Sequence, residues 1–329
     1  MAILVTGASG HLGGHVVTAL LERGVAASDI VAGVRTPDKA APLVDLGVRI
    51  AQLNYAEPAT IDAALQGVDR ILLISGSEVG TRLAGHLNVI EAAKKAGVEK
   101  FVYTSAPKVT SADYALGAEH RATEEAIAAA GLPAVILRNN WYHENYTQDV
   151  LGAAASGVIA AAAGEGRVAS ASRRDYAEAA AVVLTEDGHA GQVYELAGDV
   201  AWTYDELAAA ASEILGKDVA YVSQSAADKQ AQLEQFGLPA DVAQFVVGID
   251  LAIADGVLAD TDGTLARLIG RPTTPLVEGL RTAVAETQPA AWGLAGPALP
   301  RRTRVVTRSL APVDEESSSA SREPRDADR

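Results

Sequence analysis

Three glycines near the start of the chain have a spacing suited to binding a phosphate. Gly7, Gly10 and Gly13 form a GxxGxxG pattern directly after the apolar run 2–6 and at the start of a segment with helical periodicity. Gly7 permits a tight turn, Gly10 lets a pyrophosphate approach the backbone, and Gly13 lets the helix pack closely on the strand. The helix N-terminus presents free N–H groups and a partial positive charge to the phosphate. The strand–turn–helix context therefore favours a dinucleotide site over a purely structural turn. The residues expected to contact the cofactor here are Gly7, Ser9, Gly10, His11, Leu12 and Gly13.

The second apolar run, 30–34, is followed by Arg35, where a protein that binds NAD carries an acidic residue for the ribose 2′-hydroxyl. A guanidinium at this place suits a 2′-phosphate, because it can pair with two phosphate oxygens. A carboxylate there would repel the phosphate. The sequence therefore favours NADP(H) over NAD(H) as the cofactor. The alternative is that Arg35 is an ordinary surface arginine.

Polar residues and a glycine at the ends of two further runs are candidates for contact with the cofactor, because ligands bind beside the carboxyl ends of parallel strands. Asn54 follows the run 48–53 and is expected to hydrogen-bond the adenine. Ser75 and Gly76 lie at the end of the run that starts at residue 70, and we expect the cofactor's ribose to pass them.

A nicotinamide cofactor needs a hydride acceptor and often a proton donor beside it. Thr104 and Ser105 end the run 100–105, the place at which short-chain dehydrogenases carry a catalytic serine. The Tyr-x-x-x-Lys pair that works with that serine is missing. Leu116 stands at the expected tyrosine position, and His120 stands at the expected lysine position.

The missing tyrosine favours an acceptor that is already electrophilic. General acid–base help is worth about 10²- to 10⁴-fold in rate, and quinones and cationic dyes need that help least. Their anionic product can take a proton from water or from His120, which is neutral or cationic near pH 7 and could supply a charge or a proton. The alternative for His120 is a structural histidine that caps the helix or bonds the cofactor ribose.

The elements that must position these residues follow from the apolar pattern over residues 1–138. Continuous apolar runs alternate with helix-period segments, at 2–6, 30–34, 48–53, 70–75, 100–105 and 134–138. Unalternating runs separated by helices predict parallel strands buried on both faces. The predicted fold class is α/β, a Rossmann-type doubly wound parallel sheet, which forms an NADP-binding domain. Residues 170–198 are expected to return to this domain.

The alternation of apolar runs and helix-period segments ends after residue 138. Residues 139–169 and 199–288 are expected to form a smaller, mostly helical C-terminal domain that covers the strand ends and forms one wall of a cleft. Its helix after Thr203 begins with the capping box Thr203-Tyr204-Asp205-Glu206. Residues 289–329 hold several prolines and few periodic apolar residues, which predicts a disordered tail.

The amino-acid composition excludes or disfavours several kinds of site and function. The 329 residues include no cysteine, which excludes disulfides, thiolate nucleophiles and cysteine-based metal sites. The 27 basic and 42 acidic residues give a net charge of −15, which disfavours nucleic-acid binding. We expect no metal site, because the histidines are scattered, and no membrane span, because no apolar stretch is long enough. A cytoplasmic location is the default, and a homodimer is left open.

Six segments together resemble the NmrA-like atypical short-chain dehydrogenases, and more closely the type 2 NAD(P)H:quinone oxidoreductases and the triphenylmethane reductases among them. The resemblance covers residues 1 to about 286, and the family also lacks the Tyr-x-x-x-Lys pair. It implies an NADPH-binding domain, a small C-terminal domain, and a quinone site in the cleft between them. The segments are TGASGHLG (6–13), LLISGSEVG (72–80), YTS (103–105), LRNNWYHENY (137–146), ASASRRDY (169–176) and VYELAGD (193–199).

The resemblance also implies roles for individual residues in holding the cofactor. The glycine loop and Arg35 would hold the pyrophosphate and the 2′-phosphate, and Ser75, Gly76 and Ser77 would line the path of the ribose and nicotinamide. Thr104 and Asn139 would complete the cofactor site. Arg173 is expected to reach the cofactor, and the alternative for it is an ion pair with Asp175 or Glu178.

The substrate side of the cleft is assigned to the segment after residue 138. The resemblance implies that Asn139, Asn140, Trp141 and Tyr142 face the nicotinamide or the substrate. Independently, Trp141, Tyr142 and Tyr146 leave the sixth strand at its carboxyl end, where their rings could stack on a planar acceptor. The alternative for Trp141 is a place in the core between the domains. The candidate catalytic residues are Ser105, His120 and Tyr142.

The predicted function is an NADPH-dependent oxidoreductase that transfers a hydride to quinones or similar electrophilic planar acceptors. The alternative is a non-catalytic protein that senses NADP(H) and changes the activity of a partner, as NmrA-like regulators do. A third hypothesis, an enzyme similar to isoflavone reductases or epimerases, is less favoured because the expected helix carries no tyrosine or lysine base.

Overall fold

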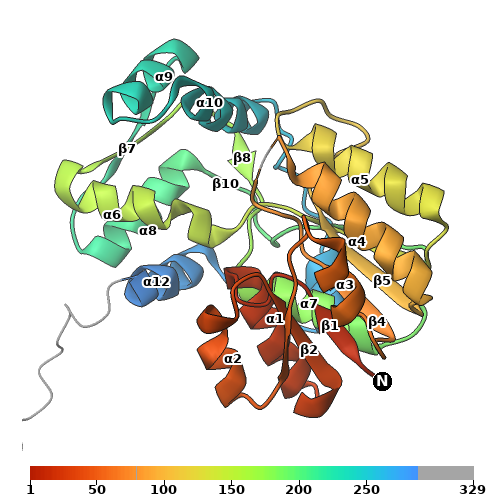
Figure 1. Ribbon diagram of the computed structural model, residues 1–329. Coiled ribbons are helices and arrows are strands. Elements are labelled where there is room, and N and C mark those ends of the chain that lie inside the picture. Colours follow the sequence, from red (N-terminus) through yellow and green to blue (C-terminus); the bar gives the residue numbers. More distant parts are fainter. Residues whose placement is uncertain (79, 288–329) are drawn as a thin grey trace, which may run out of the picture. The chain divides into compact units, whose positions relative to one another are not determined.

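A computed structural model of the chain describes residues 1–78 and 80–287, and the tail expected over 289–329 lies outside them. Seven parallel strands form the main sheet (Figure 1), and the order reverses between β1 and β4. This reversal is the switch point beside which Rossmann sheets bind ligands. The predicted fold class is therefore confirmed. Across the sheet the strands are β3 (Arg49–Gln52), β2 (Ile30–Val34), β1 (Ile3–Val5), β4 (Arg70–Leu73), β5 (Lys100–Ser105), β6 (Ala134–Asn139) and β9 (Val193–Leu196).

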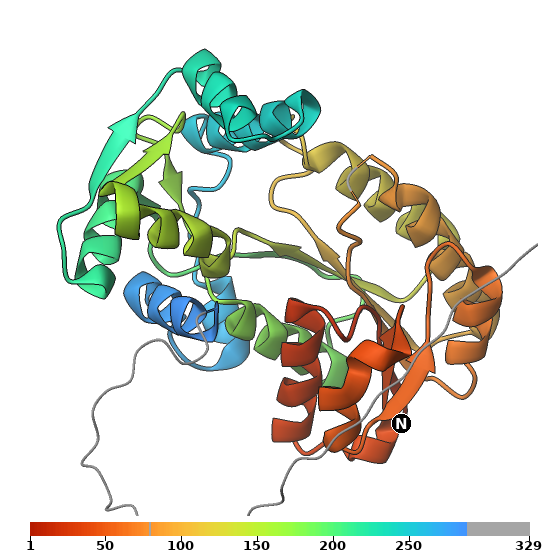
Figure 2. The same ribbon diagram turned by 60° about the vertical axis from the view of Figure 1, so that its left-hand side comes forward.

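Helices cover both faces of the sheet, and for this reason its strands are continuous apolar runs. Alternate residues of one strand serve the two layers, since Ile3 and Val5 lie in one core and Leu4 lies in the other. Figures 1 and 2 show the two layers on opposite sides of the sheet. The first layer contains α1 (His11–Glu22), α2 (Ala41–Asp45) and α7 (Arg173–Thr185). The second contains α3 (Pro58–Ala64), α4 (Arg82–Ala96) and α5 (Gly117–Ala130).

The segment after residue 170 contributes to this sheet from far along the chain. The helix α7 packs against α1, and β9 pairs in parallel with β6 at the edge of the sheet. Small buried side chains of α7 at Ala177 and Ala180 allow the close approach. A capping box of Ser172 and Asp175 starts α7, because each side chain accepts a hydrogen bond from the other residue's backbone N–H.

A second group of elements has its own apolar core (Figure 2), around Trp202, Leu207 and Ile253. The capping box predicted at Thr203 is present and starts α8. Two small sheets, which the sequence did not suggest, join this mostly helical group: β7 (Val158–Ala161) pairs with β11 (Ala220–Ser223), and β8 (Arg167–Val168) pairs with β10 (Trp202–Thr203). The helices of this part of the chain are α6 (Thr147–Ser156), α8 (Tyr204–Leu215), α9 (Ala226–Gln235), α10 (Ala240–Ala254), α11 (Thr264–Ile269) and α12 (Leu276–Thr287).

The boundaries of the two expected domains stay a prediction, because residues 1–289 group as one compact unit. Three short 3₁₀ helices complete the secondary structure, at Ala27–Asp29, Pro37–Ala40 and His143–Tyr146. Over residues 1–78 and 80–287, none of the helices combines the length and the hydropathy that a membrane span requires.

Candidate active site

The glycine loop has the geometry that its spacing predicts. Gly7 has φ +59°, in the left-handed region that favours glycine. A Cβ atom on Gly13 would lie 2.3 Å from the Gly7 carbonyl oxygen, so only glycine allows α1 to approach the loop this closely. The helix α1 begins after Gly10 with no side-chain cap and no acidic residue in its first turn. Its free N–H groups and its dipole are therefore available to an anion such as a pyrophosphate.

Arg35 and Asn54 follow strands β2 and β3, as predicted. The Arg35 guanidinium is exposed and lies 2.9 Å from the Glu78 carboxylate. The Asn54 side chain is used locally, because it accepts a hydrogen bond from the Ala56 N–H at 3.1 Å and donates one to Glu57 at 2.7 Å. A contact between Asn54 and the adenine therefore stays a prediction that would require this turn to rearrange.

A cavity of about 120 Å³ brings seven of the predicted site residues together. These seven are Ser75, Ser105, His120, Asn139, Asn140, Trp141 and Tyr142. The remaining lining was not predicted from the sequence, and it consists of Ala106, Pro107, Tyr114, Leu116, Asn145, Ile249, Ala252 and Leu258. None of the residues that line this cavity is an Asp, Glu, Lys or Arg. The site is therefore an uncharged chamber whose walls include several aromatic rings.

Asn139 is the last residue of β6 and Asn140 follows it, and they are only 5% and 6% exposed. The Asn140 side chain donates to the Leu258 carbonyl at 3.1 Å and accepts from the Trp141 N–H at 2.7 Å. The Leu258 carbonyl also accepts the Ala169 N–H at 2.7 Å. Asn140 thus anchors the wall of the cavity through its amide, and a direct role in binding substrate stays a prediction.

The Asn139 side chain differs from its neighbour, because neither its oxygen nor its nitrogen makes a hydrogen bond of normal length among the described residues, although the Tyr142 phenol lies close to it. Buried polar groups are almost always paired. An unpaired amide beside a cavity therefore indicates a place for a polar group of a ligand. A carboxamide such as that of nicotinamide offers the matching donor and acceptor. The Asn139 side chain therefore fits the carboxamide of the expected nicotinamide cofactor.

His120 projects from α5 and is buried at the cavity wall. Its Nδ1 atom lies 2.8 Å from the Tyr103 hydroxyl. Burial, together with the positive charge of Arg82, lowers the pKa of His120 to about 3. The imidazole is therefore held neutral at pH 7, which argues against a positive charge on His120, and its catalytic role stays a prediction.

The hydroxyls of Ser105 and Thr104 form hydrogen bonds with neighbouring residues of the protein. The Ser105 hydroxyl donates to Glu124 at 2.5 Å, and Glu124 in turn forms a two-pronged ion pair with Arg138 at 3.0 and 2.6 Å. The Thr104 hydroxyl accepts the Ser75 N–H at 2.9 Å. Both hydroxyls are thus engaged within the protein, and the catalytic role of Ser105 and the cofactor contact of Thr104 stay predictions.

Arg173 lies over the ring of Tyr142, with 4.9 Å between the guanidinium carbon and the ring centroid. The ion pair considered for Arg173 is wrong, because Arg271 pairs with Asp175 and Glu178, each at 2.7 Å. Burial raises the pKa of the Tyr142 phenol, which keeps it protonated at pH 7. A role for Arg173 in holding the cofactor stays a prediction.

Tyr146 does not line the cavity. It is buried in the apolar core of the second group of elements, edge-on to Trp202 at a centroid distance of 4.9 Å. The stacking role expected for Tyr146 is therefore not supported. Trp141 packs against that same core, as its alternative interpretation expected, and it also lines the cavity, so its contact with a substrate stays a prediction.

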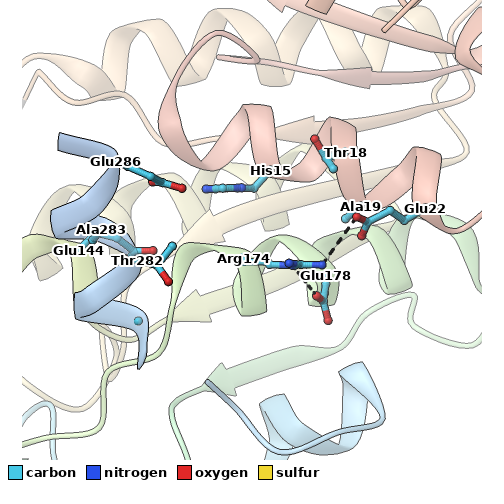
Figure 3. A pocket seen from close by; sticks show the side chains of 11 residues that line it. His15, Thr18, Ala19, Glu22, Glu144, Arg174, Glu178, Thr282, Ala283 and Glu286 are labelled. Atoms are coloured by element: carbon cyan, nitrogen blue, oxygen red, sulfur yellow. Dashed lines mark hydrogen bonds and ion pairs between the residues drawn. The ribbon is translucent and has the colours of Figure 1, made fainter. Parts of the chain in front are cut away.

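A second cavity, of about 200 Å³, lies between α1, α7 and α12 (Figure 3). Its lining includes Glu22, Glu144, Glu178 and Glu286, together with Arg174, and none of the predicted site residues. An excess of carboxylates disfavours a phosphate. The glycine loop and the uncharged cavity stay the predicted cofactor site.

A Rossmann sheet with a phosphate loop at its switch point and an uncharged cavity at its strand ends defines a dinucleotide-binding α/β protein. Residues 7–187 match the protein family described as NAD(P)H-binding, and the chain belongs to this family. The resemblance to NmrA-like proteins that the six segments suggested is confirmed.

Known relatives include both curated proteins and solved structures. The chain is 46% identical to quinone oxidoreductase 2 of Escherichia coli, over 84% of this chain and 97% of that protein. The crystal structure of the NADPH-dependent quinone oxidoreductase of Escherichia coli with NADPH matches with a TM-score of 0.82 at 46% identity, over 85% of this chain and 99% of that one. The NADP(H) complex of Citrobacter sp. triphenylmethane reductase matches with a TM-score of 0.79 at 37% identity, over 86% and 100%.

Proposed function

We propose that this protein is an NADPH-dependent oxidoreductase that reduces quinones or similar electrophilic planar acceptors. The glycine loop and the start of α1 would hold the pyrophosphate, and Arg35 would hold the 2′-phosphate. When bound, the cofactor supplies a hydride at its nicotinamide ring. The observation that carries the proposal is Asn139, a buried amide that makes no hydrogen bond of normal length within the described part of the chain and lines the same uncharged cavity as Trp141 and Tyr142.

The residues of the chain bind, orient and enclose the reactants. Asn139 would orient the nicotinamide through its amide, and the rings of Trp141 and Tyr142 would pack on the flat acceptor. Apolar side chains such as Leu258 exclude water from the chamber. The reduced acceptor would take its proton from water as it leaves the chamber, since the imidazole of His120 is neutral and is not a ready proton donor.

The regulatory alternative is less well supported, because the relatives at 46% and 37% identity are described as an oxidoreductase and a reductase. A cytoplasmic location and a homodimer stay predictions.

The test uses the full chain, without added flavin. NADPH absorbance is followed on addition of 1,4-benzoquinone, and NADPH affinity is measured by calorimetry. We expect the natural protein to oxidise NADPH. Asn139→Ala should lower kcat by about 10²-fold, the size of effect seen when a positioning or charge-stabilising contact is removed. Tight NADPH binding with no turnover across a panel of quinones would instead establish the NADP(H)-sensing alternative.

A further inference from the structure

We infer that Tyr103 is a positioning residue that fixes the tautomer of His120, so that the Nε2–H of His120 donates a hydrogen bond to the oxygen of the bound acceptor. This inference rests on the proposed function and assigns His120 the role of a neutral hydrogen-bond donor, which keeps its proton throughout the reaction.

The phenol of Tyr103 determines which His120 nitrogen is unprotonated. Tyr103 lies on β5 and is fully buried, and within the described residues its hydroxyl has one hydrogen-bond partner, His120 Nδ1, at 2.8 Å. Burial raises the pKa of Tyr103 above its ordinary range, so the phenol keeps its proton. A buried hydroxyl proton needs an acceptor. Nδ1 is that acceptor, and it therefore carries no proton.

The hydroxyl of Thr123 also lies close to these rings, and it already has two hydrogen-bond partners. Its hydroxyl donates to the Glu119 carbonyl at 2.8 Å and lies 3.0 Å from His86 Nδ1. His86 Nε2 accepts the Gly76 N–H at 3.0 Å, so the proton of His86 is on Nδ1 and is donated to Thr123. Thr123 thus accepts from His86 and donates to the backbone. Its oxygen also lies near the Tyr103 phenol, but no hydrogen bond of normal length joins the two among the described residues, so His120 Nδ1, at 2.8 Å, is the acceptor for Tyr103.

The two histidines whose rings pack near Tyr103 therefore have opposite tautomers. The ring centroids of His86 and His120 lie 5.6 and 5.9 Å from that of Tyr103. His86 is turned toward the backbone of the loop after β4. His120 lines the cavity, and its Nε2 atom has no hydrogen-bond partner among the residues that the structure describes.

The Nε2–H group at the cavity wall can stabilise negative charge as it develops on an acceptor oxygen. A donor that is already in place in an enclosed, uncharged chamber is effective, because it requires no reorganisation during the reaction. A hydride from NADPH and a proton from water together convert the quinone into the hydroquinone. The imidazole of His120 therefore has the same protonation state before and after each turnover. The low pKa of His120 agrees with this role and argues against a role as a proton donor.

The tautomer can be measured directly by NMR of the full chain labelled with ¹⁵N-histidine, without cofactor or quinone. The chain has six histidines, and the His120 signals are assigned by their loss in His120→Gln. We expect His120 to show a protonated Nε2 and an unprotonated Nδ1, and one further buried histidine, His86, to show the reverse pattern. A protonated Nδ1 on His120 would overturn the inference. This result does not depend on turnover, so it stays interpretable if the proposed function fails.

Kinetics test the role of the donor. With 1,4-benzoquinone we expect His120→Leu to lose about 10²-fold in kcat, whereas His120→Gln, which retains an N–H donor, should lose much less. Tyr103→Phe should lower kcat by about tenfold with the dissociation constant of NADPH unchanged, and its His120 signals should show a mixture of tautomers. Equal kcat values for His120→Leu and the natural protein would overturn the role in the reaction.

Discussion

The Arg35 guanidinium and the Glu78 carboxylate form an ion pair of 2.9 Å at the place where a 2′-phosphate is expected. The side chains are 72% and 68% exposed, so the pair contributes little to stability. Its importance lies in binding, because a phosphate at Arg35 would meet the negative charge of Glu78. The loop after β4 thus places an acidic residue beside the residue that should select the cofactor.

Glu78→Gln should tighten NADPH binding by several-fold, because it removes this negative charge and frees the guanidinium. Arg35→Ala should weaken NADPH binding by about 10-fold or more, since hydrogen bonds to charged groups are worth about 1.5–3 kcal/mol. NADH binding should change little in both variants. Calorimetric titration with each dinucleotide measures these effects, and an unchanged NADPH/NADH preference in Arg35→Ala would show that Arg35 is an ordinary surface residue.

Gly13→Ala should destabilise the protein and weaken dinucleotide binding, because its Cβ would lie 2.3 Å from a backbone oxygen and α1 would have to move. Overpacking of this kind costs about 1–3 kcal/mol. Gly14→Ala is the matched control in the next position of the same helix, where the Cβ would meet Ala8 only at 3.8 Å. That variant should be neutral or more stable by up to about 1 kcal/mol. Urea unfolding and NADPH titration compare the two, and equal losses would contradict the close-approach argument.

Arg138→Met should lower the free energy of unfolding by about 3 kcal/mol, because it leaves the Glu124 carboxylate, whose side chain is only 11% exposed, without its cation. The double variant with Glu124→Gln should recover part of this loss. Ser105→Ala should be milder and should change kcat by only a few-fold, because its hydroxyl donates to Glu124. Denaturant unfolding and quinone kinetics separate these cases, and a large loss of kcat in Ser105→Ala with intact stability would restore its catalytic role.

The buried histidine His120 should make the protein less stable in acid. Its pKa is about 3 in the folded chain against an ordinary 6.5, so below pH 6.5 the unfolded chain binds a proton that the folded chain does not. Stability is therefore lost as the pH falls. In His120→Gln the slope of the unfolding free energy against pH should be smaller by up to about 1.4 kcal/mol per pH unit between about pH 6 and pH 4. Above pH 7 the two slopes should coincide, and equal slopes in acid would show that His120 is not held neutral.

Local signals in the sequence predicted the parts of the fold and site that depend on local geometry. The glycine loop and the capping box at Thr203 each fix a conformation within a few residues, and both are present. The buried parallel strands followed from apolar runs, because helices cover both faces of the sheet. The position of Asn139 followed from its place at the end of β6.

Features that depend on distant segments could not be read from the sequence. The neutral state of His120 arises from burial and from Arg82 on another helix, and the partner of Ser105 is Glu124 on α5. Tyr146 belongs to a core built from segments up to α12, so its spacing from Trp141 did not show which way it faces. The cavity wall from α10 has no distinguishing pattern, because several of the apolar residues of that helix are buried for packing alone.

The carbonyl of Leu258 is held from two directions, by the Asn140 side chain and by the Ala169 N–H. The backbone at this point of the chamber is thus anchored, and the Leu258 side chain is one of three aliphatic side chains on this wall, with Ile249 and Ala252. If the proposed acceptor binds here, a single substitution at residue 258 should change the tolerance for larger, fused-ring acceptors without remodelling of the surrounding loop.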